Sequence, residues 1–389
     1  MNKRLLITLT TAIFLLIATI ITIKLAKGYR PNLKDGSLKP TGLLLANSIP
    51  QGAQVFINDK LSTATDDTLN LSPGEYEIKI SKEGYLSWEK KLKIEAELVT
   101  ETNAHLFPAV TELKPLTFTG VSKPVISPQG SAIAFSIATS SAELKAGIWI
   151  LDLATGPLSF PPKPKQIAKS TKFLDFSNSN YSFSPDGSKL LVNFKIASFL
   201  LETDRLNSQY NDIKTKVLGI KDQWQEEKDL EKKAWLPRFP EEISKLMDES
   251  AKIIALSPDE TKILYLAEKN IEIPQDLIPK VLASSTQPEE RDLKANVIYV
   301  YDRREDRNFR ILEAIENIAW LSDSRHLLFT EDGKIKIIEY DGKNETVVYA
   351  GDFKENFAVA WPDGSRLVIL ANLNPDSPLA PNLYAIYLR

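Results

Sequence analysis

The chain of 389 residues contains no cysteine and only two histidines, His105 and His326. It can therefore form no disulfide, no thiolate metal ligand and no lipid-modified N-terminal cysteine. A zinc site and a Ser-His-Asp triad both combine histidine with other ligands or catalytic side chains, and two histidines are few for either. The sequence patterns of phosphate-binding glycine loops, zinc proteases and serine hydrolases do not occur either. We expect a protein that is not an enzyme, with no catalytic residue, no metal site and no cofactor.

Charge is distributed unevenly along the chain. Residues 1–40 hold seven Lys and Arg and one Asp, a balance of +6, so the other 349 residues carry −9 because the whole chain carries −3. An acidic body argues against nucleic acid as a partner, since phosphate contacts need a basic face. The basic N-terminal segment is suited to anionic lipid headgroups.

Residues 5–23 form a run of 19 residues without charge, and a helix of that length is roughly 28 Å long, close to the thickness of a bilayer core. We expect a transmembrane helix at 5–23. A cleaved signal peptide is the alternative, although the run is long and no A-x-A site follows it. Lys and Arg flank both ends, but a short basic head at 1–4 favours a cytoplasmic N-terminus and an extracytoplasmic body.

Residues 24–40 are rich in Lys, Gly and Pro and predict a stalk. Short alternating segments follow, such as Glu75 to Ile80, in which Tyr76, Ile78 and Ile80 share one face of a strand. Residues 41–107 resemble the PEGA domain, a small β-sandwich of microbial surface proteins that carries no catalytic residues. The resemblance rests on a turn formed by Pro50, Gln51, Gly52 and Ala53 and on later Pro73-Gly74 and Gly84-Tyr85 pairs.

One turn recurs five times in residues 108–389, in forms such as FSPDGSKLLV and AWPDGSRLVIL. Proline at the second position and glycine at the fourth are typical of a type I turn, and the aspartate can bond its own backbone. One aspartate per turn cannot assemble a calcium site, which needs six to eight oxygens in one place. We therefore assign a structural role to the turn residues Pro128, Pro185, Asp186, Gly187, Pro258, Asp259, Pro362, Asp363 and Gly364, as to Pro50, Gly52 and Ala53.

Each turn is followed by a strand and then by a second strand, a unit typical of a β-propeller blade. The spacing predicts five blades, with six as an alternative. The chain ends after the third strand of the last blade, so we expect residues 112–119 to supply the fourth. The units resemble the propellers of the Tol-system translocation protein and of prolyl-oligopeptidase-like enzymes, a resemblance that implies the fold but not the function. The predicted fold is thus mainly β.

Two insertions interrupt the repeats. Residues 207–250 predict two helices, with a stripe of Ile213, Val217, Ile220 and Trp224 on the first. This stripe either packs on the propeller or docks a partner, and we expect any exposed aromatic cluster at Trp224, Trp235 and Phe239. Residues 271–295 predict a mobile rim loop.

These features favour a membrane-anchored extracytoplasmic binding or scaffold protein of the cell envelope, with protein or cell-wall polymer as partner. The alternative is an accessory subunit of an envelope or secretion complex that docks through the helical insertion. A hydrolase with its site in the propeller channel is a weaker alternative, because it would need clustered carboxylates on the inner strands.

Overall fold

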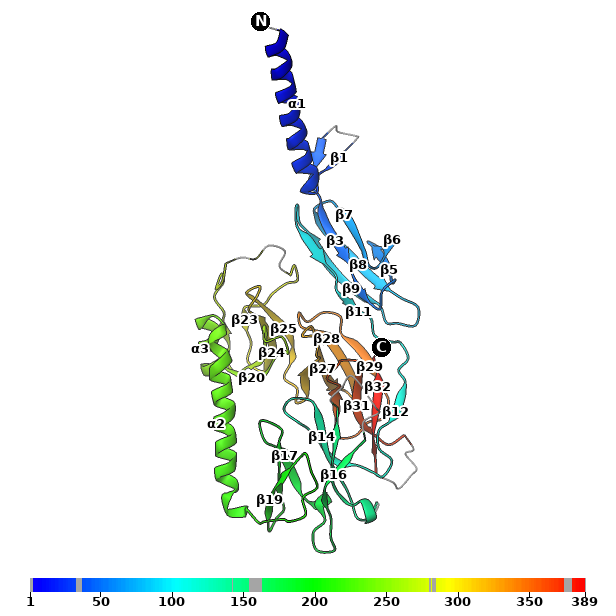
Figure 1. Cartoon of the computed structure of the whole chain (residues 1–389), viewed down its shortest axis with the longest axis vertical. Coiled ribbons are helices and arrows are strands. Elements are labelled where there is room, and N and C mark those ends of the chain that lie inside the picture. Colours follow the sequence, from blue (N-terminus) through cyan, green and yellow to red (C-terminus); the bar gives the residue numbers. More distant parts are fainter. Residues whose placement is uncertain are drawn as a thin grey trace. The chain divides into compact units, whose positions relative to one another are not determined.

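The computed structural model describes residues 3–32, 37–141, 143–153, 163–279, 281, 285–373 and 380–388. Residues 1–2 of the expected cytoplasmic head therefore lie outside the described residues. The chain divides into two compact units (Figure 1): Met1–Ala109 with Pro279–Pro288, and Val110–Ile278 with Glu289–Arg389. Strands dominate both units, as the sequence predicts.

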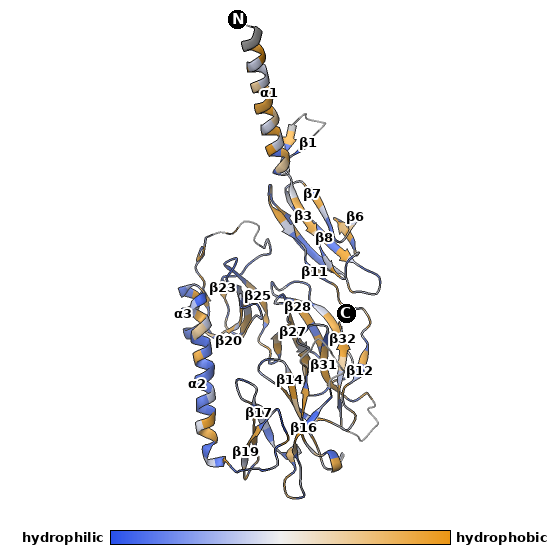
Figure 2. Cartoon of the chain, viewed as in Figure 1, coloured by the Kyte–Doolittle hydropathy of each residue, from blue (hydrophilic) through white to orange (hydrophobic). Residues whose placement is uncertain are grey.

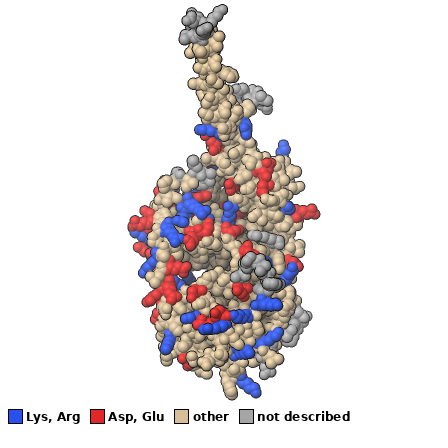
Figure 3. Space-filling model, in the orientation of Figure 1, with Lys and Arg blue, Asp and Glu red and all other residues tan. Residues whose placement is uncertain are grey.

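The first unit begins with helix α1 (Lys3–Ala26), whose segment Leu6–Ala26 is long and apolar enough to cross a membrane. None of this segment is buried against the protein. Figure 2 colours much of the helix as hydrophobic, and in Figure 3 the described part of the helix shows no Lys, Arg, Asp or Glu until its C-terminal end. The hydroxyls of Thr11, Thr19 and Thr22 donate to carbonyls one turn earlier at 2.7–2.8 Å, so they do not oppose burial in lipid.

The segment predicted as a stalk is fastened to the sandwich. It begins with the last residues of α1 and contains a hairpin of β1 (Arg30–Asn32) and β2 (Ser37–Lys39). Thr41 donates its hydroxyl to the carbonyl of Gly28, and Lys27 pairs with Glu97 at 3.4 Å. These contacts hold the segment after the apolar helix against the start of the sandwich.

The sandwich packs two sheets around one core, as the alternating strands predict. Ile78 and Ile80 of β8 are buried, and Tyr76 packs against the same cluster with Leu44 and Trp88. One sheet has the order β10-β3-β7, another β6-β5-β8-β9, and β4 pairs with β11. The strands are β3 (Gly42–Ala46), β4 (Ser48–Ile49), β5 (Gln54–Ile57), β6 (Lys60–Ala64), β7 (Asp67–Leu71), β8 (Gly74–Ser81), β9 (Trp88–Ile94), β10 (Val99–Glu101) and β11 (Ala104–His105).

The second unit contains five consecutive antiparallel sheets, the blades of the predicted propeller. Four have four strands, and the second has three. In chain order the blades are β13 (Ser122–Ile126), β14 (Ala132–Ile137), β15 (Gly147–Asp152) and β16 (Lys165–Lys169); β17 (Asn180–Phe183), β18 (Lys189–Asn193) and β19 (Ser198–Glu202); β20 (Ala251–Leu256), β21 (Lys262–Ala267), β24 (Val297–Asp302) and β25 (Arg307–Glu313); β26 (Ile318–Trp320), β27 (His326–Glu331), β28 (Lys334–Glu339) and β29 (Thr346–Tyr349); and β30 (Ala358–Ala360), β31 (Arg366–Ala371), β32 (Asn382–Tyr387) and β12 (Leu113–Pro115).

The last blade is completed from the start of the unit, which confirms the prediction for residues 112–119. β12 pairs antiparallel with β32, with Leu113 opposite Ile386. Thr117 strengthens this joint, because its hydroxyl accepts from the Leu383 amide at 2.9 Å and donates to Asn382 at 3.0 Å. Residues about 265 positions apart thus close one sheet.

The helical insertion completes the core beside the third blade. It consists of α2 (Val217–Trp235), a short 3-10 turn η4 (Leu236–Arg238) and α3 (Glu241–Glu249). Ile243, Leu246 and Met247 are buried, as the sequence predicts, in one cluster with Tyr265 and Tyr299 of the third blade. Other clusters join the fifth blade to the first, the first to the second and the third to the fourth.

α2 differs from α3 because no residue of α2 is fully buried. Figure 1 shows it running from beside β19 of the second blade to α3 beside β20 of the third. The predicted stripe of Val217, Ile220 and Trp224 is half-buried, and Leu218 keeps 77% of its surface exposed.

The second insertion contains a short hairpin. Its ends form a hairpin of β22 (Ile271–Glu272) and β23 (Asp292–Leu293). Residues 279–288 belong to the first unit, where Gln287 donates to the Lys91 carbonyl of β9 at 2.8 Å. Residues 280 and 282–284 of the predicted rim loop lie outside the described residues.

Candidate functional site

The five repeat turns share one backbone geometry. In each, the amide of the fourth residue donates to the carbonyl of the first, as in Gly187 to Ser184 at 2.9 Å, which agrees with the predicted type I turn. The fourth residue is always left-handed, with φ between 57° and 73°. Glycine adopts this conformation without strain. The five residues at this position are Gly130, Gly187, Glu260, Ser324 and Gly364.

The carboxylates of three turn aspartates accept hydrogen bonds from backbone amides of their own turns. Asp186 accepts from the Ser188 amide at 3.0 Å, Asp259 from the Thr261 amide at 3.1 Å, and Asp363 from the Ser365 amide at 2.8 Å. Hydrogen bonds from Ser184 and Ser188 lower the pKa of Asp186 to about 2. Burial acts to raise the pKa of Asp259, but the hydrogen bonds from Ser257 and Thr261 outweigh it, and that pKa also falls to about 2.

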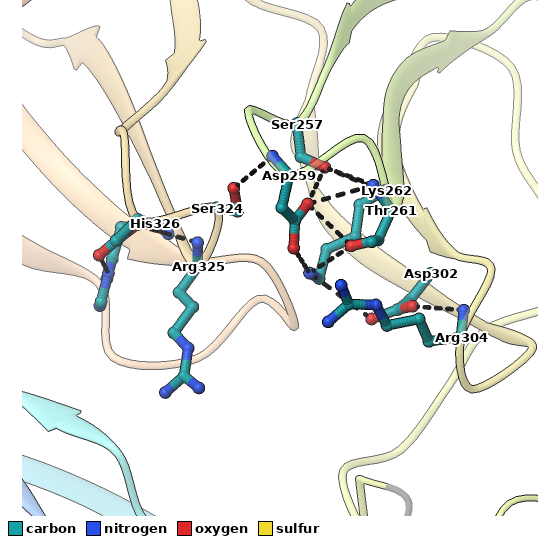
Figure 4. Close-up of polar contacts among 10 residues, drawn as sticks. Ser257, Asp259, Thr261, Lys262, Asp302, Arg304, Ser324, Arg325 and His326 are labelled. Atoms are coloured by element: carbon teal, nitrogen blue, oxygen red, sulfur yellow. Dashed lines mark hydrogen bonds and ion pairs between the residues drawn. The ribbon is translucent and has the colours of Figure 1, made fainter. Parts of the chain in front are cut away.

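The turn of the third blade carries a buried ion cluster (Figure 4). The Lys262 ammonium lies 3.6 Å from Asp259 and 3.7 Å from Asp302, and 4.8 Å from the ring centre of Tyr340. The side chains of Lys262 and Asp302 are only 7% and 5% exposed. Burial raises the pKa of Asp302, and the charge of Lys262 opposes that rise.

This cluster joins neighbouring blades. The Asp259 amide donates to the Ser324 hydroxyl of the fourth blade at 2.9 Å, and the Arg304 amide donates to Asp302 at 2.8 Å. Because the Lys262 ammonium lies between the two carboxylates, it offsets one of their two negative charges within the fold. The arrangement is suited to holding two blades together.

No motif in the sequence points to this cluster, although strand register gives a signal for it. Lys262 opens the second strand of its blade and lies opposite Asp302 at the end of the third. Lys189 is opposite Glu202, and His326 opposite Glu339, in the same positions of two other blades. Strand register thus brings a residue just after the turn opposite one at the end of the next strand, and in the third blade these two residues form an ion pair.

The aromatic residues predicted as an exposed cluster do not form one. Phe239 is only 5% exposed, because it packs against Tyr301 and lies 5.6 Å beneath the Arg303 guanidinium. Trp235 makes an edge contact with Phe239 and is partly buried in the same core. Trp224 lies apart on α2, where it is half-buried. The prediction of exposure is wrong for Phe239, because the third blade needs an apolar cover on this face.

The turn predicted to be structural in the sandwich is held by Thr65. The Gly52 amide donates to the Thr65 carbonyl at 2.9 Å, and the Ala53 amide to its hydroxyl at 3.0 Å. Gly52 has a φ of 71°, and Ala53 is fully buried. Pro50 precedes them, and its carbonyl accepts from Ser48 at 2.7 Å. These contacts position the turn.

Residues 41–109 match the PEGA domain family, which confirms the resemblance of the sandwich. A search of curated proteins finds no match.

Among solved structures, the chain is similar to a putative TolB from Agrobacterium tumefaciens (15% identity, 69% of this chain and 79% of that one, TM-score 0.23). It is also similar to TolB from Acinetobacter baumannii (12%, 80% and 59%, TM-score 0.23). A third similar structure is an oligogalacturonate lyase from Vibrio parahaemolyticus (9%, 81% and 86%, TM-score 0.27). The assignment of blades rests on the sheets themselves.

Proposed function

We propose that this chain is a membrane-anchored binding or scaffold protein of the cell envelope, with its N-terminus in the cytoplasm and both folded units outside it. The observation that carries the proposal is the exposed apolar surface of α1, which a short hairpin segment connects to a PEGA domain. An apolar helix of this length is stable in a bilayer and unfavourable in water. Protein or cell-wall polymer is the expected partner.

A binding role without catalysis is supported by the first strand of each blade. The first strands β13 and β17 of two neighbouring blades contact each other, and first strands line the axis of a propeller. None of the five described first strands contains Asp or Glu. A channel hydrolase of the kind considered from the sequence would need carboxylates there.

The absence of cysteine allows a direct test of topology. Single variants Asn2→Cys, Ser62→Cys and Lys343→Cys place one thiol in the head, the sandwich and the propeller. In intact cells, a membrane-impermeant maleimide should label the second and third variants but label the first only after permeabilisation. The mass of the purified protein should include residues 1–26. Labelling of the first variant alone, or loss of the N-terminal segment, would refute the anchored topology.

The alternative of an accessory subunit that docks through the helical insertion has one supporting observation. Leu218 and Leu230 of α2 are 77% and 65% exposed. Deleting residues 207–250 would not test this role cleanly, because it would uncover the core of the third blade. Leu218→Ser with Leu230→Ser leaves that core intact. Loss of crosslinked partners in this variant, but not in the matched Leu61→Ser variant of the sandwich, would favour the subunit role.

A further inference from the structure

Among the described residues of the second unit, five large apolar side chains lie almost entirely in solvent. Val110, which is 87% exposed, precedes β12 at the start of the unit, and the other four lie in loops between strands. The exposed fractions are 79% for Phe118, 99% for Leu144, 99% for Phe173 and 84% for Ile196. Each occupies a different loop, so they cannot be the outward face of one strand or helix. A single exposed apolar residue needs no special cause, but four in neighbouring loops do.

The strand directions place these loops at the same end of their sheets. In the first blade, β14 and β16 both run antiparallel to β15, so Leu144 after β14 and Phe173 after β16 lie at one end. In the second blade, Ile196 follows β18 at the end where β17 begins. In the fifth blade, Phe118 follows β12, which runs antiparallel to β32.

Contacts between the loops show that they are neighbours. The backbone at Gly120 lies close to Ser141, because a Cβ atom added to this glycine would be 3.4 Å from the Ser141 hydroxyl oxygen. The loop of Phe118 therefore lies beside the loop of Leu144. The Thr139 hydroxyl donates to Asp175, which joins the loop of Leu144 to that of Phe173. The rings of Phe176 and Phe194 are 5.6 Å apart, which joins the loops of Phe173 and Ile196. The four apolar tips therefore belong to one continuous loop surface.

Lysine stands next to three of these tips. Lys145 follows Leu144, Lys172 precedes Phe173, and Lys195 precedes Ile196, and all three lysines are exposed. Lys214, which also lies beside Ile196, donates to the Lys195 carbonyl at 2.8 Å. Figure 1 shows α2 beginning beside β19 at this end of the second blade.

Two carboxylates of these loops, Asp175 and Asp212, accept hydrogen bonds from groups within the loops. Asp175 accepts from Thr139 and from the Ser177 amide, and these hydrogen bonds outweigh burial and lower its pKa. Asp212 accepts from the amides of Ser198 and Lys214 at 3.0 and 2.9 Å. The surface thus combines protruding apolar tips with exposed ammonium groups, although the body of the chain is acidic.

We propose that this loop surface binds the surface of an anionic phospholipid bilayer. Separate apolar tips can enter the boundary between headgroups and acyl chains, while adjacent lysines pair with phosphates. A protein partner would be expected to meet a packed apolar centre with few lysines, since lysine is depleted at such interfaces. The proposal relies on the anchor inferred above only to keep the second unit near a membrane.

Environment-sensitive labels on single cysteines test this contact in the full chain. Leu144→Cys, Phe173→Cys and Ile196→Cys variants are labelled and reconstituted into vesicles of phosphatidylcholine, with or without phosphatidylglycerol. Emission should shift to shorter wavelength only with the anionic lipid, and high salt should reverse the shift because it screens the lysines. A label at Lys343→Cys, in the turn between β28 and β29 at the other end of its sheet, should not respond.

Charge reversal separates binding to anionic lipid from binding to an envelope protein. Each lysine at an anionic surface contributes about fivefold in binding, the equivalent of ~1 kcal/mol, so K145E, K172E and K195E together should abolish the lipid-dependent shift of the Phe173→Cys label. All three side chains are exposed, so folding should be unaffected. Tip labels that behave like the control in both lipids, or that respond only to added envelope protein, would overturn the proposal. Failure of every variant to enter vesicles would instead refute the anchor.

Discussion

At the scale of single residues, the turn aspartates make folding depend on acid pH. Because the folded pKa of Asp186 is about 2, below its ordinary value of 3.8, the unfolded chain takes up its proton first as the pH falls. The stability from this residue is therefore present above about pH 4 and is lost as the pH falls toward 2. Asp186→Asn should keep the turn, because the amide oxygen can still accept from Ser188, but should weaken this pH dependence.

Hydrogen exchange of the amides in β17 and β18 of the full chain, compared at pH 5 and pH 2.5, measures the effect of Asp186→Asn. The difference between the two pH values should be smaller in the variant than in the unchanged chain. Ser188→Ala serves as a second variant that removes one hydroxyl donor and should give an intermediate difference. Equal differences in all three proteins would show that the carboxylate does not stabilise the turn.

At the scale of elements, the helical insertion has two parts that differ in burial. Phe239 and α3 belong to the core of the third blade, whereas no residue of α2 is fully buried. Phe239→Ala should lower the free energy of unfolding of the second unit by about 3–5 kcal/mol, since it removes a buried aromatic side chain from the third blade. Trp224→Ala, the same kind of change on half-buried α2, should cost less than about 1 kcal/mol. Urea unfolding of the full chain in detergent measures both, and similar losses would mean that α2 also belongs to the core.

The same insertion shows how far sequence could predict this molecule. Periodicity placed both helices and the inward residues Ile243, Leu246 and Met247, because a 3.6-residue repeat depends only on local geometry. It could not tell that Phe239 is buried, since that depends on which face of the third blade lacks a neighbouring sheet. The ion pair of Lys262 and Asp302 could not be predicted for a related reason. It joins two residues that only the register of their strands brings together.

At the scale of the whole molecule, the joint between β12 and β32 ties the start of the second unit to its end. Thr117 is 5% exposed, and its hydroxyl is the acceptor for the Leu383 amide. Thr117→Val keeps the shape but leaves that buried amide without its acceptor, which costs about 1–3 kcal/mol. Because the lost bond closes the last blade, we expect faster hydrogen exchange in β32 and β31, at the far end of the sequence.

The matched change Thr346→Val controls for the substitution itself, because the Thr346 hydroxyl donates to a carbonyl only two residues away in the fourth blade. It should leave exchange in β31 and β32 unchanged. If Thr117→Val instead accelerated exchange only around residue 117, the last blade would be stable without its fourth strand. The five blades would then hold together through the apolar clusters between them, including the one that joins Val121 and Phe135 to Trp361, rather than through closure of the chain.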